Sequence, residues 1–273
     1  MRVYYFVESK WAVEDICKRR LKICRFFDLN DPFELLGGGL IDKGLRKKVK
    51  GWAKKINEGS GLICFSANWR SPLMWSHYGE RHKGMCLGFE VQGDLLRAIA
   101  YKRGRIQLAQ WKDDNSVNPP AKLREMFLYT KFIDWKYEDE RRVVLPIKSL
   151  TKDGDLYFKP FDDTLKLVEV IAGHRCCVGW KPIIERAVNG LQSAPKPKLI
   201  KARLAFRKFE VVTQQWGFDA SNAWEQCGDS CLTWSRKIGQ PAKWKTSSQP
   251  AIKMAGKRSK DDATSPSESH SSV

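Results

Sequence analysis

Long apolar runs are missing from this sequence. No stretch reaches the roughly 20 predominantly apolar residues that a membrane-spanning helix needs. The start of the chain meets a charge at Glu8 and builds no apolar segment of signal-peptide length. Its eight cysteines occur in segments such as LICFS and GMCLGF, which is typical of buried free thiols. We therefore expect no membrane association and a reducing, cytoplasmic compartment.

Several familiar catalytic and metal motifs are also missing. Gly37, Gly38 and Gly39 are not followed by the Lys-Ser/Thr of a phosphate-binding loop, and no Gly-x-Ser-x-Gly elbow occurs. Histidine is scarce, and His77 and His82 stand five positions apart, which does not place both on one helical face. Cysteine pairs at zinc-binding spacing do not recur. The sequence predicts neither a nucleotide motor nor a serine hydrolase, and we expect no metal.

Positive charge is abundant. Lys and Arg number 49 against 31 Asp and Glu, a formal net charge of +18, which attracts polyanions such as nucleic acid. Simple solubility explains such a charge equally well. Residues 43–55 hold seven basic residues and no acid, so a helix here would present a basic surface with Trp52 on or near it. The candidate nucleic-acid contacts are Arg46, Lys47, Lys48, Lys50, Lys54, Lys83, Lys131 and Arg142.

Helical and strand patterns alternate along the chain. Apolar and β-branched runs predict strands, and amphipathic runs with capping residues predict helices, with Ser9 capping one and Ser71 another. This mixture predicts an α+β fold, a single mixed-sheet domain with interspersed helices. Expected strands are 2–7, 21–27, 61–66, 84–91, the later part of 135–147, 164–173 and a closing pair in 197–212. Expected helices are 9–20, 43–55, 71–79, 119–132 and 180–191.

The character of the chain changes near residue 212. We expect a domain over 1–215, then an irregular Trp-rich extension over 216–250 that lies outside the core, because apolar periodicity is lost there. Residues 251–273 have the polar, Ser-rich composition of a disordered tail. The tryptophans of the extension are Trp216, Trp224, Trp234 and Trp244.

Two polar-aromatic segments are the candidates for a site. In LMWSHYGERHKGMCLGFE we expect Leu73, Met74 and Trp75 to be structural, and the remaining polar side chains to line a cleft. In WKYEDERR, an extended backbone would put Glu138, Glu140 and Arg142 on one side. Two carboxylates beside an arginine suit acid–base or cation-stabilising chemistry, whereas a salt-bridged edge strand is the commoner use of this pattern. The cleft candidates of the first segment are His77, Tyr78, His82 and Lys83.

These segments resemble a bacterial family of domains of unknown function, DUF2971. The motifs that carry the resemblance are VYYFV near the start, NDPFE at 30–34, CFS at 64–66, LMWSHY at 73–78, HKG at 82–84 and WKYEDERR at 135–142. They occur in the family's order and cover residues 1 to about 215. The chain departs from the family at Arg141, where tryptophan is usual.

The order of these motifs is similar to that of ADP-ribosyltransferases, in which NAD lies in a split sheet. The resemblance implies that Ser66 contacts the ribose, Tyr78 stacks on nicotinamide, and Glu138 or Glu140 stabilises the positively charged ribosyl group. Tyr5 would contact the cofactor from the first strand, where such enzymes usually carry Arg or His. His77 is a further catalytic candidate.

We therefore expect a cytoplasmic bacterial effector, of phage-defence or toxin type, with ADP-ribosyltransferase-like chemistry on nucleic acid or a nucleic-acid-associated target. An antitoxin or other regulatory protein is a further candidate partner. One alternative is a noncatalytic nucleic-acid-binding module, in which the basic segments 43–55, 97–105 and 196–208 contact phosphates and the Trp-rich extension stacks on bases. The other is a metal-independent nuclease with His77 or His82 as general base.

Overall fold

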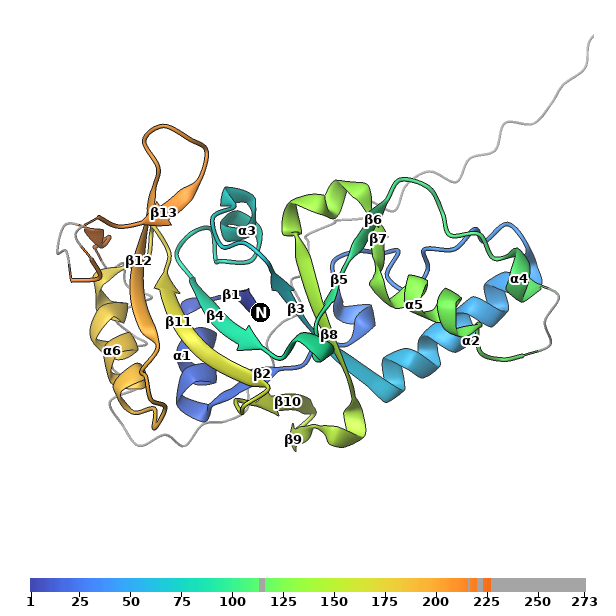
Figure 1. The fold of residues 1–273 in the computed structure, drawn as a ribbon, viewed down its shortest axis with the longest axis horizontal. Helices are drawn as coiled ribbons and strands as arrows, with labels where there is room; N and C mark the ends of the chain where they lie inside the picture. Colours follow the sequence, from blue (N-terminus) through green and yellow to red (C-terminus); the bar gives the residue numbers. More distant parts are fainter. Residues whose placement is uncertain (113–115, 216, 220–222, 227–273) are drawn as a thin grey trace, which may run out of the picture.

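The structure, a computed structural model, describes residues 1–112, 116–215, 217–219 and 223–226, and within them eight strands form one mixed sheet (Figure 1). The order is β13-β12-β11-β4-β1-β3-β8-β5, and only β11 and β12 run parallel. The strands are β1 (Arg2–Val7), β3 (Ser60–Ser66), β4 (Met85–Val91), β5 (Arg97–Ala98), β8 (Glu140–Pro146), β11 (Leu165–Ala172), β12 (Lys198–Leu204) and β13 (Val211–Thr213).

Helices and two smaller sheets complete the described part of the chain, which confirms the α+β prediction. The helices are α1 (Ser9–Lys18), α2 (Lys43–Gly59), α3 (Pro72–His77), α4 (Ala109–Lys112), α5 (Ala121–Tyr129) and α6 (Lys181–Asn189). The small sheets contain β2 (Arg20–Lys22), β10 (Leu156–Pro160) and β9 (Thr151–Asp153), and β6 (Ala100–Lys102) with β7 (Thr130–Phe132). Short 3-10 helices are η1 (Phe26–Asp28), η2 (Gly93–Leu95), η3 (Ile133–Glu138), η4 (Ile147–Ser149) and η5 (Val178–Trp180). Among the described residues, no helix combines the length and the apolar character that crossing a bilayer requires.

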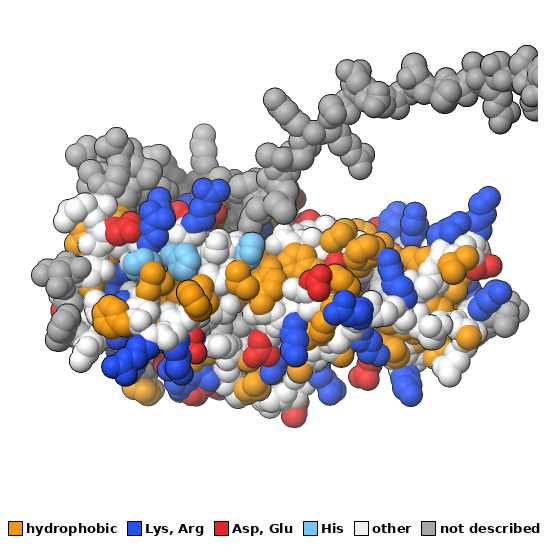
Figure 2. Space-filling view, turned by 90° about the horizontal axis from the view of Figure 1, so that it is seen from above, with side chains coloured by type: hydrophobic (Ala, Val, Ile, Leu, Met, Phe, Trp, Pro, Cys, Tyr) orange, Lys and Arg blue, Asp and Glu red, His pale blue; other side chains and the backbone are white. Residues whose placement is uncertain are grey.

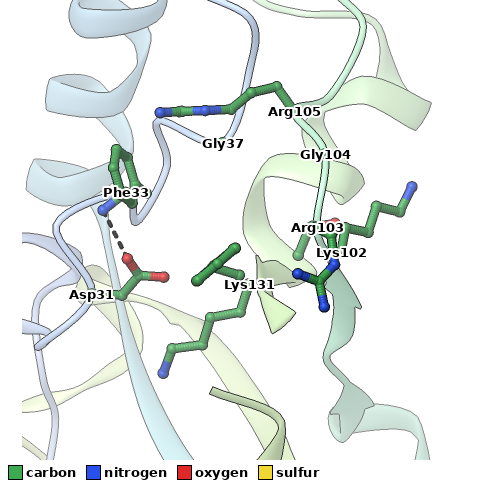
Figure 3. Close-up of a pocket in the computed structure, with 10 residues that line it drawn as sticks. Asp31, Phe33, Gly37, Lys102, Arg103, Gly104, Arg105 and Lys131 are labelled. Carbon is green, nitrogen blue, oxygen red and sulfur yellow. Dashed lines mark hydrogen bonds between the residues drawn. The ribbon is translucent and has the colours of Figure 1, made fainter. Parts of the chain in front are cut away.

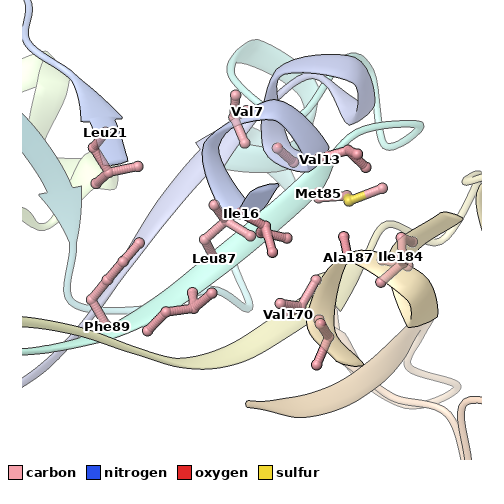
Figure 4. Close-up of a cluster of buried hydrophobic side chains, with 14 of the residues drawn as sticks. Val7, Val13, Ile16, Leu21, Met85, Leu87, Phe89, Val170, Ile184 and Ala187 are labelled. Atoms are coloured by element: carbon pink, nitrogen blue, oxygen red, sulfur yellow. The ribbon is translucent and has the colours of Figure 1, made fainter. Parts of the chain in front are cut away.

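The main core lies between one face of the sheet and helices α1 and α6 (Figure 4). Side chains alternate along β4, so that Met85, Leu87 and Phe89 point to this face and are fully buried. Each large apolar side chain buried in this way contributes about 1.5–3 kcal/mol to stability. Cys86 points to the opposite face, where α3 covers a second cluster around Trp75.

A third core cluster lies around α2 and α5. Trp52 is 1% exposed, and its ring centroid lies 5.2 Å from that of Phe127. The expectation that Trp52 sits on the basic surface of this helix is therefore wrong. Its position in the apolar stripe of α2 puts it in the core, while the cations occupy the other faces.

The sheet is split between β1 and β3. Strands β1 and β4 pair along all six residues of β1, whereas β1 and β3 pair only where Tyr4 faces Ser66. Nearer the start of β3, Leu62 pairs with Cys24 instead: the backbone N–H of each residue donates to the carbonyl of the other at 2.9 Å. The two strands therefore diverge, and side chains from both border the space between them.

One of the two predicted helix caps is confirmed and the other is wrong. Ser71 accepts a hydrogen bond from the Met74 backbone N–H, and Pro72 is the first helical residue, as predicted. Ser9 is not a cap: Glu8 holds that position, and the Ser9 hydroxyl donates to the Lys83 carbonyl at 2.9 Å. The strand expected over 21–27 is shorter in the structure: β2 spans Arg20–Lys22, and η1 occupies the end of the expected range.

The Trp-rich extension is partly core. Trp224 is 6% exposed and packs edge-on against Phe218 with ring centroids 5.0 Å apart. The Trp224 indole N–H donates to the Phe218 carbonyl at 3.0 Å, and Lys201 Nζ lies 5.0 Å from the Trp224 ring. The prediction that this segment lies outside the core is wrong for these two aromatic residues. Trp216, Trp234, Trp244 and the tail 251–273 lie outside the described residues.

Candidate functional site

A cavity of about 240 Å³ opens where β1 and β3 diverge. Its walls come from both strands, from the turn before α2, from α3 and from the start of β8. We call it the split-sheet pocket. Its lining residues are Tyr4, Tyr5, Phe6, Val7, Glu8, Trp11, Cys24, Asp28, Leu29, Asn30, Cys64, Phe65, Ser66, Met74, Tyr78, Lys131, Glu138 and Glu140.

Glu138 presents its carboxylate to this pocket. It is the last residue of η3 and is 5% exposed. One oxygen, Oε1, accepts from the Tyr78 hydroxyl at 2.5 Å, and the other, Oε2, accepts from Lys131 Nζ at 2.5 Å. Asp139 follows in a left-handed conformation (φ 42°), which turns the chain so that Glu140 begins β8. Residues 135–138 are therefore a 3-10 turn and not extended, although the expected carboxylates still lie together.

Glu138 is the first member of a buried row of ion pairs in which acidic and basic side chains alternate. Lys131 Nζ lies 2.5 Å from Glu138 and 3.3 Å from Glu140. Arg142 Nε donates to Glu140 at 2.8 Å, and its Nη1 donates to Glu34 at 2.6 Å. Three carboxylates against two cationic groups leave a formal charge of one negative unit. Glu138 stands at one end of the chain and lines the pocket, so negative charge is available where a ligand would lie.

The pKa values in this chain reflect burial and ion pairing. Burial opposes ionisation of Glu140, but the charges of Arg142 and Lys131 outweigh it and lower the pKa of Glu140 to about 2. Burial also disfavours the Lys131 ammonium, yet Glu140 and Glu138 raise its pKa above the usual lysine value. Burial, with the nearby Glu138 charge, raises the pKa of Tyr78. Tyr78 is thus a hydrogen-bond donor to Glu138.

Three motifs far apart in sequence meet at this chain of charges. The NDPFE turn supplies Asn30, whose Nδ2 donates to the Tyr78 hydroxyl at 3.3 Å, and Glu34, which pairs with Arg142 across 108 positions. The LMWSHY segment supplies Tyr78, and WKYEDERR supplies Glu138 and Arg142. No site role was predicted from sequence for the residues of NDPFE, so Asn30 and Glu34 were missed. The signal that could have found Glu34 was an acidic residue directly after the predicted turn.

The two other residues expected to hold a cofactor also line the pocket. Tyr5 lies edge-on to Phe65, with ring centroids 6.2 Å apart, and burial raises its pKa. Ser66 is buried, and its hydroxyl donates to the Asn68 carbonyl at 2.9 Å while accepting from the Asn68 N–H at 3.2 Å. The Ser66 proton is therefore used within a local turn, and its oxygen is what a ligand could contact.

The expected histidines lie elsewhere. His77 is exposed beside Tyr137, ring centroids 5.7 Å apart, and does not line the split-sheet pocket, which corrects its expected place in the cleft. His82 stacks on Trp75 instead, with ring centroids 6.4 Å apart. Burial lowers the pKa of His82, and its Nδ1 is buried without a hydrogen-bond partner in the described structure.

A strained turn separates the two histidines. Glu80, Arg81 and His82 have φ values of 51°, 53° and 69°, a conformation that costs non-glycine residues about 1–2 kcal/mol each. The turn closes with the Gly84 N–H donating to the Gly79 carbonyl at 2.9 Å. A Cβ at Gly84 would lie 2.5 Å from the Val7 carbonyl, so only glycine fits. The adjacent Lys83 is exposed away from the split-sheet pocket.

The basic candidates divide into three groups. Lys47, Lys50 and Lys54 are exposed on α2, and Lys54 lies 3.9 Å from the Glu58 carboxylate. Blue side chains are scattered over the whole of the face shown in Figure 2. Lys131 and Arg142 are 7% and 0% exposed, so their expected role as nucleic-acid contacts is wrong. Both side chains form ion pairs with buried carboxylates. Two further α2 candidates hold backbone carbonyls: Arg46 those of Leu40 and Ile41, and Lys48 that of Trp111.

No family model, curated protein or solved structure matches the chain. The family resemblance and its implied activity therefore stay predictions, and function is argued from the site. Among the described residues, no group of three or more His, Cys, Asp or Glu side chains is arranged to hold a metal ion.

Proposed function

We propose that this protein is an ADP-ribosyltransferase-like enzyme that binds the nicotinamide end of NAD in the split-sheet pocket. The observation that carries the proposal is Glu138, a pocket-lining carboxylate held by Tyr78 and Lys131 at the end of a buried ion-pair chain. The acceptor is nucleic acid or a nucleic-acid-associated target, as the charge of +18 suggests. We further propose a cytoplasmic effector of phage-defence or toxin type, controlled by a partner such as an antitoxin.

The chemistry follows from where the negative charge lies. When the bond between the ribose carbon and nicotinamide breaks, nicotinamide leaves with the bonding electrons, and positive charge develops on the ribosyl group. Glu138 stabilises that charge, and its two hydrogen bonds hold the carboxylate in place. An acceptor atom then bonds to the ribose carbon and releases its proton. Lys131 and Tyr78 are positioning residues in this scheme.

The pocket fits one end of NAD. Its volume of about 240 Å³ is below the ~300–1,000 Å³ usual for whole ligands, so the adenosine end would lie outside it. Aromatic side chains, among them Tyr5, Trp11 and Tyr78, offer faces for a nicotinamide ring. Ser66 Oγ is the acceptor available to a ribose hydroxyl. The cytoplasmic assignment is supported by the free thiols of Cys24 and Cys64 in the same walls.

A noncatalytic nucleic-acid-binding module is the second candidate, supported by the exposed cations Lys47, Lys50 and Lys54 on α2. A nuclease using His77 or His82 as general base has less support, because neither histidine lines the split-sheet pocket.

The test is label transfer from radiolabelled NAD to cell extract, total RNA and DNA. Purified protein is compared with Glu138→Gln, which keeps the size of the side chain and removes its charge. It is also compared with Tyr78→Phe, which removes the hydrogen bond to Glu138 and the one from Asn30. Glu58→Gln is the matched control, because Glu58 is 64% exposed on α2 and does not line the split-sheet pocket. We expect transfer by the wild type and the control, loss of transfer in Glu138→Gln, and a reduction of about tenfold or more in Tyr78→Phe.

Three outcomes would count against the enzyme proposal. Transfer by Glu138→Gln at the wild-type rate would exclude the role of this carboxylate. Absence of transfer by every protein, with salt-sensitive retention of nucleic acid, would favour the binding module. Shortened RNA or DNA in the absence of NAD would favour the nuclease.

A further inference from the structure

A second hollow of about 260 Å³ shares Lys131 with the split-sheet pocket (Figure 3). The segment that follows β6 forms one wall, and the NDPFE turn and β7 form the others. We call it the basic pocket. Its lining residues are Asp31, Phe33, Gly37, Lys102, Arg103, Gly104, Arg105, Thr130, Lys131 and Phe132. Lys131 lines both hollows, and Asn30 of one precedes Asp31 of the other.

Unneutralised positive charge distinguishes this hollow. Lys102, Arg103 and Arg105 are all exposed, and within the described part of the chain none of them forms an ion pair. The Lys131 ammonium is already paired with Glu138 and Glu140. Three cations on one short segment attract phosphate groups, and the absence of a competing ion pair leaves them available.

Exposed aromatic rings occur at the same place. Phe33 is 48% exposed and Phe132 is 39% exposed, although phenyl rings are usually buried. The Arg105 guanidinium lies 4.3 Å from the Phe33 ring centroid, and its Nη1 donates to the Leu36 carbonyl at 2.9 Å. This contact fixes the Phe33 ring beside the cations. Aromatic rings next to cationic groups are what unpaired bases and their phosphates bind.

A carboxylate adds a feature that an inorganic anion would not use. Asp31 is 4% exposed, and its Oδ1 accepts from the Phe33 N–H at 2.9 Å. Its second oxygen points toward the hollow in Figure 3. That oxygen suits a donor such as a base amine or a ribose hydroxyl, whereas it would repel a bare phosphate. The combination of Asp31, two phenyl rings and three cations therefore fits a nucleotide.

We propose that the basic pocket binds one nucleotide of a single-stranded nucleic acid, with the base against Phe33 and Phe132 and the phosphate on Lys102 and Arg103. A duplex keeps its bases paired and stacked, so it cannot present one in this way. This proposal extends the function proposed above by naming a single strand as the acceptor. Binding of the strand does not depend on that function, whereas its role as acceptor rests on it. Lys131 lines both hollows, so a bound strand would lie beside the carboxylate site.

Binding is measured by fluorescence anisotropy with short labelled oligouridine RNA, oligothymidine DNA and a DNA duplex, without NAD. The variants are Phe33→Ala/Phe132→Ala and Lys102→Gln/Arg103→Gln. The control is Lys152→Gln/Lys166→Gln, which removes the same charge from exposed positions in β9 and β11. All substituted side chains are exposed, and thermal unfolding checks that each variant is folded.

We expect both single strands to bind more tightly than the duplex. The relative affinities of oligouridine RNA and oligothymidine DNA show which of the two nucleic acids the pocket prefers. The phenylalanine variant should lose affinity about tenfold or more with an unchanged salt dependence, because stacking is lost. The Lys102→Gln/Arg103→Gln variant should reduce the slope of log K against log salt by about 0.7, the value for one phosphate contact on a single strand. The control should change affinity about twofold or less.

Three results would overturn the proposal: pocket variants that bind like the control, a duplex that binds as tightly as single strands, or binding lost only when Phe206 and Phe209 are replaced. These two rings are 89% and 101% exposed on the loop between β12 and β13, and the Arg203 guanidinium lies 4.7 Å from the Phe206 ring centroid. Because binding is measured without NAD, its failure is distinct from a failure of label transfer.

Discussion

Replacement of Glu140 by glutamine tests the buried ion-pair chain most directly. Glu140 is 2% exposed and lies between Lys131 at 3.3 Å and Arg142 at 2.8 Å. Glutamine keeps the shape of the side chain and removes the charge that both cations share. Two buried cations would then remain with Glu138 and Glu34 alone, and each would lose an opposing charge in a medium where such a loss is costly.

The expected loss follows from the pKa. The surroundings lower the pKa of Glu140 from 4.5 to about 2. A difference of this size corresponds to about 3 kcal/mol in the free energy of unfolding, at about 1.4 kcal/mol per pKa unit. Removing one partner of a buried ion pair independently costs about 3–5 kcal/mol, in agreement. The folded-state pKa is depressed, so this stabilisation is complete above about pH 4.5 and is lost as the pH falls through about 2.

Urea unfolding followed by tryptophan fluorescence measures the effect. We expect Glu140→Gln to be about 3 kcal/mol less stable than the wild type near pH 7, and the difference to shrink below half of that by about pH 3. Glu58→Gln on exposed α2 should change stability by about 0.5 kcal/mol or less at both pH values. A difference between wild type and Glu140→Gln that stays constant across this range would refute the assigned ionisation of Glu140.

Two further predictions concern the contact between the C-terminal segment and the core. Trp224→Ala should lower the free energy of unfolding by about 3–5 kcal/mol in urea, because its ring is 6% exposed against Phe218, and a loss below about 1 kcal/mol would contradict its place in the core. Burial lowers the pKa of Lys201 to about 8. The unfolded chain then holds more protons between about pH 8 and 10.5, so wild-type stability should rise with pH there relative to Lys201→Met, and parallel curves would count against the shift.

Local patterns in the sequence were sufficient for most of the secondary structure. The Ser71-Pro72 start of α3 and the alternation of Met85, Leu87 and Phe89 in β4 each depend on residues close in the chain. Such local patterns indicate the backbone preference of a segment and which of its faces is apolar, so they predict an element before the tertiary structure is known. They fail where a partner is distant: Ser9 has the right type for a cap, yet its hydroxyl bonds to Lys83.

The candidate site was found from sequence only in part. Tyr78, Glu138 and Glu140 were recognised from dense polar-aromatic segments, and they do line one pocket. His77 belongs to the same segment but lies outside that pocket, because one more helical position turns a side chain by about 100 degrees. Composition identifies a segment, whereas the backbone decides which of its side chains face the cavity.

What the sequence determined by itself was the inventory: the α+β pattern, the positive charge, and the acidic and aromatic residues from which a site could be built. Only the tertiary structure decided that Glu34 meets Arg142 across 108 positions. It also decided that Lys131 and Arg142 are buried with carboxylates while Lys102 and Arg103 remain exposed. A lysine or arginine has the same charge in either setting. Its burial depends on whether distant segments bring it a partner that compensates for its lost hydration.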